Sequence, residues 1–385
     1  MGHAWFRYLL RDLFRKRMVL VVTGLAVLFA VGWTVHRVYW DGWRPSRVLG
    51  ESVGEIPLAF SPDGTILVAR TQKNVQPEDL KPWRLSTGKP GAVWIKDGPR
   101  FGLATAFSPD GKTLATTVGG INAGSNPTSK NVQVVLIDVA TGQPRLTWEA
   151  NATLVYRLGW ARDGGSLHAA LGSSAFTEVV TWDAATGREL ASWPISYASD
   201  TLAVGFSPDG KTLAEGRAGP GLDLWDLEHN RVYANLETPS SIRSRPHGID
   251  YTPDGQTLIV SRDDGSVGIW DLPTRKLVKT IPVFPSHWWF DWIELAPDGR
   301  TFVAVTHPKP ANSPAAGAFR YLARKLFGWV QDYPKPQAVL VDIASGQKLG
   351  QAEQASHPVY SPDSRTIAVH DEQRGIVLYP VPIRP

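Results

Sequence analysis

From about residue 46 onward, the chain is a succession of short segments in which apolar and polar residues alternate. In a well-defined example, one segment ends at Phe206, the next begins with Thr212–Ala214, and a third covers Leu222–Leu227. Alternation with a period of two is typical of strands that bury one face, because successive side chains of a strand point to opposite sides. Gly, Pro and Asp separate the segments, as they do in tight turns. The pattern therefore predicts an all-β fold.

The turn between the first and second segments repeats along the chain. In Ser207-Pro208-Asp209-Gly210, proline fixes φ at the first central position, aspartate suits the second, and glycine adopts the left-handed conformation without a Cβ clash. Related versions of this turn place an aspartate at Asp63, Asp110, Asp163, Asp209, Asp254, Asp298 and Asp363. Successive aspartates are 44 to 53 residues apart, except for the last two, which are 65 apart. Repeats of roughly 40–50 residues that each hold several short strands predict a β-propeller, here with seven blades.

The third segments end in a second motif. Trp182-Asp183, Trp225-Asp226 and Trp270-Asp271 each close a third strand, and the second repeat has Ile137-Asp138 at this position. Together with the repeated Pro-Asp-Gly turn, these dipeptides resemble those of WD-repeat β-propellers over roughly residues 46–382. The resemblance implies four-stranded blades that close into a ring.

The two ends of the repeat region predict how this ring closes. Arg47–Leu49 is a short strand before the first repeat, whereas the last repeat ends near Pro382 after its third strand. In WD-repeat propellers, which the chain resembles, the N-terminal strand supplies the outer strand of the last blade. We therefore expect Arg47–Leu49 to pair with Ile376–Tyr379. A ring closed in this way has no open sheet edge.

The first 45 residues follow a different pattern. Met18–Val35 carries no charge, and its 18 residues would form a helix of about 27 Å, marginally enough to cross the apolar core of a bilayer. Basic residues outnumber acidic ones in residues 1–17, which places this tail in the cytoplasm by the positive-inside rule. We therefore expect a single-pass cell-membrane protein. Its parts are a cytoplasmic tail (1–17), a transmembrane helix (18–35), a linker (36–45) and an extracytoplasmic propeller (46–385). The alternative is a cleaved signal peptide ending at Ala30-Val31-Gly32.

Composition narrows the chemistry. The chain has no cysteine, so it can form neither disulfides nor thiolate metal sites, and its net charge is only +4. The repeats lack the basic stripe that binds nucleic acid, and the sequence holds no Walker, zinc-hydrolase or serine-hydrolase motif. We therefore expect no cofactor, no metal and no nucleic-acid partner. We interpret Asp263-Asp264-Gly265 as a tight turn rather than a cation site.

One enzyme class remains an alternative. Quinoprotein dehydrogenases are propellers with a tryptophan-docking repeat resembling A-x-D-x-x-T-G-x-x-x-W, and Asp138-x-x-Thr141-Gly142 matches its first half. However, Trp148 and Trp193 follow the repeat glycine by six residues rather than four, and Trp94 keeps this spacing after Gly88. We interpret these tryptophans as packing residues of outer strands. A propeller enzyme, such as a quinoprotein-like dehydrogenase or a hydrolase, stays the alternative to a binding protein.

The sixth repeat holds the candidate surface for a partner. It opens with an aromatic cluster, and its insertion at 307–337 places apolar residues at helical spacing with basic residues between them. Both features belong to connections on one face of a WD-type blade, and we expect the Pro-Asp-Gly turns to lie on the other, membrane-proximal face. Aromatic and arginine side chains are enriched in interface hot spots. The predicted partner-binding residues are His287, Trp288, Trp289, Phe319, Arg320, Leu322, Arg324, Leu326 and Trp329.

These features favour a non-catalytic, membrane-anchored scaffold that binds a protein partner outside the cytoplasm. Contact of the insertion with the membrane is the alternative for the sixth repeat, because an amphipathic basic helix also suits a membrane surface.

Overall fold

A computed structural model describes residues 43–49, 54–71, 78–98, 101–119, 132–152, 154–172, 177–194, 203–217, 219–239, 241–242, 244–285, 288–308 and 335–382. The chain divides into two compact units, residues 1–44 and residues 45–385. The predicted cytoplasmic tail, the transmembrane helix and most of the linker lie outside the described residues. Within the described ranges, no helix has the length and apolar character needed to span a bilayer.

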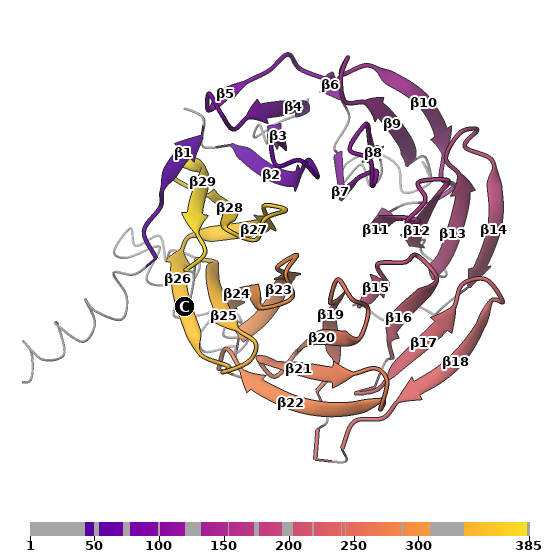
Figure 1. The fold of residues 1–385 in the computed structure, drawn as a ribbon, viewed down its shortest axis with the longest axis vertical. Helices are drawn as coiled ribbons and strands as arrows, with labels where there is room; N and C mark the ends of the chain where they lie inside the picture. The colour runs from indigo at the N-terminus through magenta and orange to yellow at the C-terminus, as the bar shows by residue number, and fades with distance from the viewer. Residues whose placement is uncertain are drawn as a thin grey trace, which may run out of the picture. The chain divides into compact units, whose positions relative to one another are not determined.

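Seven antiparallel sheets follow one another around a ring in the unit formed by residues 45–385 (Figure 1). Six blades use four strands and blade 1 uses five, ordered from the centre of the ring outward, and the predicted seven-bladed propeller is confirmed. Blade 1 consists of β2 (Glu55–Phe60), β3 (Ile66–Thr71), β4 (Glu78–Arg84) and the short outer strands β5 (Lys89–Pro90) and β6 (Ile95–Gly98). Blade 2 consists of β7 (Phe101–Phe107), β8 (Thr113–Val118), β9 (Gln133–Asp138) and β10 (Pro144–Glu149).

The remaining blades follow the same plan. Blade 3 consists of β11 (Leu154–Trp160), β12 (Ser166–Gly172), β13 (Thr177–Asp183) and β14 (Glu189–Pro194). Blade 4 consists of β15 (Val204–Phe206), β16 (Thr212–Gly216), β17 (Leu222–Asp226) and β18 (Arg231–Leu236). Blade 5 consists of β19 (Pro246–Tyr251), β20 (Thr257–Arg262), β21 (Ser266–Asp271) and β22 (Lys276–Pro282). Blade 6 consists of β23 (Trp288–Leu295), β24 (Thr301–Pro308), β25 (Gln337–Asp342) and β26 (Lys348–Glu353). Blade 7 consists of β27 (Ala355–Tyr360), β28 (Thr366–Asp371), β29 (Gly375–Pro380) and β1 (Arg47–Leu49).

The N-terminal strand closes the ring as predicted. β1 pairs antiparallel with β29, with Arg47 opposite Leu378 and Leu49 opposite Ile376. In Figure 1 the indigo β1 lies beside the yellow β29. Arg47 also reaches blade 1, where its Nη1 donates to the Leu85 carbonyl oxygen at 2.6 Å. The first and last parts of the repeat region are therefore joined by main-chain and side-chain hydrogen bonds.

Short hydrogen bonds hold the Pro-Asp-Gly turns. In blade 4, Ser207 Oγ donates to Asp209 Oδ1 (2.6 Å), and Gly210 N donates to Ser207 O (2.9 Å). Gly210 has a φ of +70°, which only glycine adopts without strain. Blade 7 has Ser364 at this position with a φ of +59°. Its hydroxyl accepts from Asp298 N of blade 6 (2.9 Å), so the strained residue also links two blades.

Apolar side chains fill the seams between blades. In the seam between blades 5 and 6, Ile259 and Val267 pack with Phe302 and Val339, and all four are fully buried. Blades are flat sheets that each present two apolar faces, so stacking around a ring buries both faces of every blade.

Outer strands cover the second turn of the following blade. The Trp148 indole lies against Gly187 of blade 3, where a Cβ would come within 2.9 Å of it. Trp94 covers Gly142 of blade 2 in the same way. These contacts support the packing interpretation of the tryptophans. One detail of it was wrong, because Trp94 lies between β5 and β6 rather than within an outer strand. At the split, Gly91 N donates to the Pro82 carbonyl oxygen (2.7 Å), but Pro82 of β4 has no N–H to donate in return.

Blade 6 requires a second correction. Trp288 and Trp289 belong to the inner strand β23, rather than to the connection that precedes it, and their backbones lie opposite Pro308 and His307. The insertion expected at 307–337 is correspondingly shorter, because β24 ends at Pro308 and β25 begins at Gln337. Aromatic and β-branched residues favour extended pairing, so the ladder continues further than the turn pattern indicated.

Candidate binding grooves

The structure describes only part of the predicted partner-binding surface. Trp288 and Trp289 lie in β23. The other predicted residues, His287, Phe319, Arg320, Leu322, Arg324, Leu326 and Trp329, lie outside the described residues. The blade 6 surface therefore stays a prediction.

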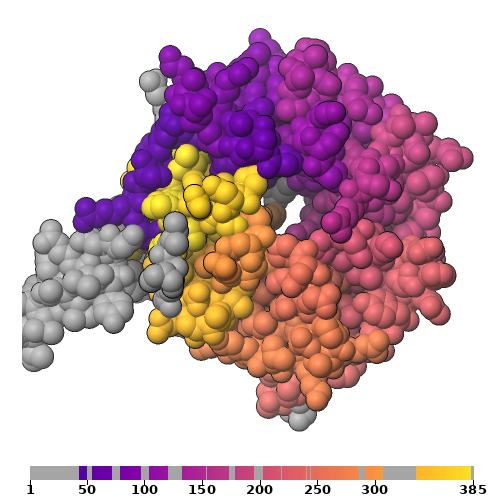
Figure 2. Space-filling model, viewed as in Figure 1, coloured from indigo at the N-terminus to yellow at the C-terminus, as the bar shows by residue number. Residues whose placement is uncertain are grey.

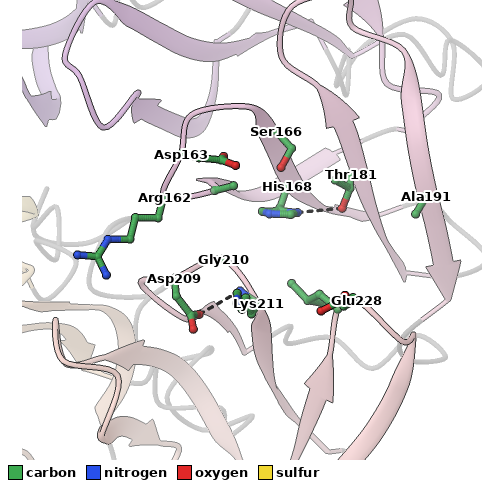
Figure 3. Close-up of a pocket in the computed structure, with 12 residues that line it drawn as sticks. Arg162, Asp163, Ser166, His168, Thr181, Ala191, Asp209, Gly210, Lys211 and Glu228 are labelled. Atoms are coloured by element: carbon green, nitrogen blue, oxygen red, sulfur yellow. Dashed lines mark hydrogen bonds between the residues drawn. The ribbon is translucent and has the colours of Figure 1, made fainter.

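Two grooves cross the seams of blades 3, 4 and 5 at the ends of the strands that carry the Pro-Asp-Gly turns. The groove between blades 3 and 4, called the 3–4 groove below, has a volume of about 720 Å³ (Figure 3). The groove between blades 4 and 5, the 4–5 groove, has a volume of about 780 Å³. Arg162 and Asp209 line both, so the two grooves adjoin. Neither was identified from the sequence, although Arg162, which replaces the turn proline of the other repeats, was a visible signal.

The 3–4 groove has one wall from each blade, as Figure 3 shows. Ser166 and His168 of β12 and Thr181 of β13 contribute to the blade 3 wall, and Asp209, Gly210, Lys211 and Glu228 form the blade 4 wall. Arg162 extends away from His168 in this view. The groove therefore has a largely polar set of lining side chains from both blades.

His168 is the buried polar group of this groove. It is 6% exposed, and its Nδ1 is 2.8 Å from Thr181 Oγ1. The ring stacks on Phe206 of blade 4, with 5.8 Å between ring centroids. Its Nε2 is buried, with no hydrogen-bond partner among the described residues. Burial lowers the pKa of His168, an effect that the nearby Asp163 carboxylate opposes, so the imidazole is neutral at neutral pH.

Two tyrosines line the 4–5 groove. Tyr251 is largely buried, and its hydroxyl lies 3.4 Å from Thr212 Oγ1. Burial raises the pKa of Tyr251, so it stays protonated and can donate a hydrogen bond. Tyr233 is 40% exposed beside it. Tyrosines of this kind offer an apolar ring and a polar hydroxyl, a combination enriched at protein interfaces.

Comparisons with known proteins agree with this architecture. A sequence profile described as "WD40: WD domain, G-beta repeat" matches residues 240–271, which include the first three strands of blade 5. The "WD repeat-containing protein SL1-17" of Schistosoma mansoni is 26% identical over 183 residues, which make up 48% of this chain and 54% of that protein. The matched profile and relative coincide with a ring of seven antiparallel blades. The chain is a seven-bladed β-propeller with a WD repeat in blade 5, and it is similar to WD-repeat proteins.

The aspartates that give WD repeats their name close turns in this propeller. Asp183 Oδ1 accepts from Thr186 N at 2.8 Å and from Thr186 Oγ1 at 2.7 Å. These hydrogen bonds, from the hydroxyl and then the amide, lower the pKa of Asp183. The predicted turn at Asp263–Asp264 is built similarly, because Asp264 Oδ1 accepts from Ser266 Oγ (2.6 Å) and Ser266 N (2.9 Å). The carboxylates at both places therefore serve the fold.

A charged cluster crosses the central channel of the propeller, which opens at the middle of the face in Figure 2. Arg157 of β11 binds Asp250 of β19 through Nη2 and Oδ1 at 2.6 Å, and Asp250 Oδ2 accepts from Leu295 N of blade 6 at 3.2 Å. Burial and the Asp250 charge raise the pKa of Glu294 to about 8. Trp292 Nε1 donates to Glu294 Oε2 at 3.3 Å. The cluster connects blades 3, 5 and 6, which is consistent with a brace for the inner rim.

Metal binding finds no support in the described part of the chain. No group of three or more His, Asp or Glu side chains within these ranges is placed to hold an ion.

Proposed function

We propose that this propeller is a non-catalytic interaction scaffold that is anchored in a membrane and binds a protein partner outside the cytoplasm. The observation that carries the proposal is the pair of adjoining grooves on a rigid, closed ring. The turn carboxylates that could do chemistry are already used to hold the fold. Binding surfaces of repeat proteins lie where rigid elements position side chains across repeats. A protein partner is expected, since WD-repeat propellers generally bind proteins.

The membrane anchor rests on residues 18–35. The segment is uncharged, and as a helix of about 27 Å it is marginally long enough to cross the apolar core of a bilayer. The basic residues before it favour a cytoplasmic tail. Protease added outside intact spheroplasts should then digest the propeller. Protection of the propeller would contradict the orientation, and a mature N-terminus at Trp33 would contradict the retained anchor.

The partner is best sought in the cell, where the anchored protein meets its own neighbours. In-cell crosslinking of the full chain, followed by detergent solubilisation and mass spectrometry, should give the same protein partner in independent preparations. A chain that crosslinks to no protein, and that purifies with an absorbing bound cofactor, would favour a propeller enzyme instead.

The blade 6 surface is proposed as one contact of this scaffold. Replacing Phe319, Leu322 and Leu326 with serine removes apolar contact area without adding charge, so partner crosslinking should fall. The matched measurement is binding of the same variant to liposomes. Loss of liposome binding with unchanged partner crosslinking would assign this segment to the membrane instead.

A further inference from the structure

The repeats of the propeller provide an internal control for the 3–4 groove. His168 lies directly opposite Thr181 in the β12–β13 ladder. The equivalent cross-strand pair is apolar in each of the other six blades, as the described ladders show: Val68–Pro82, Ala115–Leu136, Ala214–Leu224, Ile259–Ile269, Val303–Leu340 and Ala368–Leu378. A polar pair costs stability at a buried seam unless all its groups are satisfied, and His168 Nε2 has no partner among the described residues. The fold itself gives no reason for this pair.

The turn beside this pair departs from the repeat as well. Blade 3 has Ala161 and Arg162 where blade 4 has Ser207 and Pro208. The loss of the serine matters for the turn carboxylate. Serine or threonine hydroxyls donate to the turn aspartate in five blades, at 2.5–2.6 Å, with acceptors Asp63, Asp110, Asp209, Asp254 and Asp363.

Asp163 lacks that hydroxyl donor. Gly165 N donates to its Oδ1 at 2.8 Å, and this is the one hydrogen bond that the described residues make to the carboxylate. On the opposite wall, the Ser207 and Lys211 donors to Asp209 both use Oδ1. Acceptor capacity therefore remains on both carboxylates, and each lines the groove.

The charge balance of the groove selects a cationic occupant. Three carboxylates line it, those of Asp163, Asp209 and Glu228, against the two cations Arg162 and Lys211. Arg162 extends away from His168 (Figure 3), so Lys211 is the cation that faces the three acids and the neutral imidazole inside the groove. A volume of about 720 Å³ admits a long side chain together with the backbone that carries it.

We infer that the 3–4 groove receives an arginine or lysine side chain from a basic segment of the protein partner. The guanidinium or ammonium donates to Asp163, Asp209 and Glu228, and the buried end of the side chain lies beside His168. An arginine suits the site better, because its planar group with five N–H donors can serve several acceptors at once. The inference rests on the proposed scaffold function and names the chemistry of one of its contacts.

The test uses the full chain in detergent micelles and a fluorescein-labelled hexa-arginine peptide, at a roughly physiological ionic strength of about 0.15 M. The control peptide carries citrulline in place of each arginine, which keeps the shape and removes the charge. The wild-type protein should bind the arginine peptide and not the citrulline peptide in fluorescence anisotropy. Equal binding of the two peptides, or tighter binding of a hexa-glutamate peptide, would overturn the inference.

Two variants locate the binding. Asp163→Asn should weaken binding of the arginine peptide about tenfold, as expected for loss of a charge-assisted hydrogen bond. Its matched control is Asp298→Asn in blade 6, whose turn also begins with alanine and whose aspartate accepts from Arg300 N at 2.9 Å outside the groove. The control should bind like the wild type. Equal affinities of wild type and Asp163→Asn would place the peptide elsewhere and contradict the inference.

The double substitution His168→Ala with Thr181→Leu installs the apolar pair of blade 2, Ala115–Leu136, and should preserve the fold. It should weaken binding of the arginine peptide several-fold. In the wild type, the His168 ring ¹⁵N resonances should shift on peptide addition, and unchanged resonances would contradict the inference. A partner that crosslinks equally to the wild type and to this double variant would contradict the inference but would not affect the scaffold proposal. Absence of any crosslinked partner would instead contradict the scaffold proposal itself.

Discussion

The seam between blades 5 and 6 and the seam between blades 7 and 1 show two ways of joining neighbouring blades. The first joins consecutive parts of the chain, and its core is apolar, with Ile259 and Phe302 fully buried. The second joins the two ends of the repeat region. It has a smaller apolar core around Leu49 and Ala368, and it adds buried ionisable groups that have no counterpart in the 5–6 cluster.

These ionisable groups lie on both blades of the closing seam. His370 Nδ1 is 2.8 Å from the Glu55 carbonyl oxygen, and the Glu55 carboxylate pairs with Lys81. The His357 ring is 6.4 Å from the His370 ring. Burial raises the pKa of Glu55. Burial, and then the charges of Arg70 and His370, lower the pKa of His357 to about 4.

The stability of the closing seam therefore depends on pH and on strand β1, in contrast to the apolar core of the 5–6 seam. The apolar core of the 5–6 seam contributes burial that changes little with pH, while the Asp250–Glu294 group lies at its inner rim. The closing seam depends on a three-residue strand and on protonation. Its pairing also spans 332 residues of sequence, so its formation has the largest loop-closure entropy in the ring.

Deleting residues 44–51 should have the largest effect on the stability of the closing seam. The deletion removes β1 and exposes the edge of β29, which favours aggregation or non-cooperative unfolding. Thermal unfolding monitored by circular dichroism, with size-exclusion chromatography beforehand, checks this outcome. The control Val48→Thr keeps a β-branched residue at an exposed strand position and should unfold like the wild type. A monomeric deletion variant with an unchanged transition would refute closure by β1.

Truncating Phe302 probes the apolar seam. Phe302→Ala leaves a cavity between blades 5 and 6 and should lower the free energy of unfolding by about 3–5 kcal/mol, equally at pH 7.5 and pH 5. Urea unfolding at both values measures it. The control Val278→Ala, at a side chain that is 60% exposed on β22, should change stability by less than about 0.5 kcal/mol. If the loss of unfolding free energy caused by Phe302→Ala is larger at pH 5 than at pH 7.5, the 5–6 seam is also pH-dependent, and the proposed difference between the two seams is wrong.

His357 probes the closing seam through pH. Its pKa in the fold is about 4, below the value of about 6.5 in the unfolded chain. The unfolded chain therefore binds more protons, and stability falls as the pH drops from about 6.5 towards 4. Between pH 6.5 and 5 the loss from this group should be on the order of 1–2 kcal/mol. Glu55, whose pKa is raised, acts in the opposite direction and remains present in the variant.

His357→Gln should therefore lose less stability than the wild type between pH 7.5 and 5, measured by urea unfolding at each pH. The charges that act on His357, those of Arg70 and His370, are unchanged in this variant, so the difference reports the imidazole. Val278→Ala, at an exposed side chain of β22, serves as the control and should keep the wild-type pH dependence. Parallel pH profiles for His357→Gln and the wild type would refute this assignment.

The smallest effects compare one side-chain contact in each seam. Arg47 donates to the Leu85 carbonyl oxygen across the closing seam, and Lys279 donates to the Ala344 carbonyl oxygen (2.6 Å) across the 5–6 seam. Both are surface hydrogen bonds, so Arg47→Met and Lys279→Met should each cost about 1 kcal/mol or less in urea unfolding. A much larger loss for Arg47→Met would show that this side chain, rather than the β1 backbone, holds the ring closed.

Most of the fold was predictable because its signals are local. The turn chemistry of Ser207-Pro208-Asp209-Gly210 and the period-two alternation of neighbouring segments each operate within about ten residues. Their repetition then implied the blade number, and the unmatched outer strand implied the pairing of Arg47–Leu49. The errors fell at strand ends, as at Trp288 and Trp94, where ladder hydrogen bonds decide how far a strand extends.

The candidate grooves were not predicted, because their residues come together only in the ring. Arg162 replaces the turn proline of the other repeats, yet its place between two grooves depends on blades 4 and 5 packing beside it. The Arg157–Asp250 pair is 93 residues apart and passes over blade 4, whose inner strand β15 has only three residues. No sequence spacing signals such a contact.

Sequence alone specified an all-β chain of seven repeats and the strand that closes it, because alternation, turn residues and repeat length act between near neighbours in the chain. The tertiary structure decided which polar residues meet across a seam. His168 was one histidine in an alternating strand until the ladder set it opposite Thr181 and the ring stacked it on Phe206. Its unsatisfied nitrogen, and the groove around it, arise from the packing of two blades, which depends on distances that no local pattern encodes.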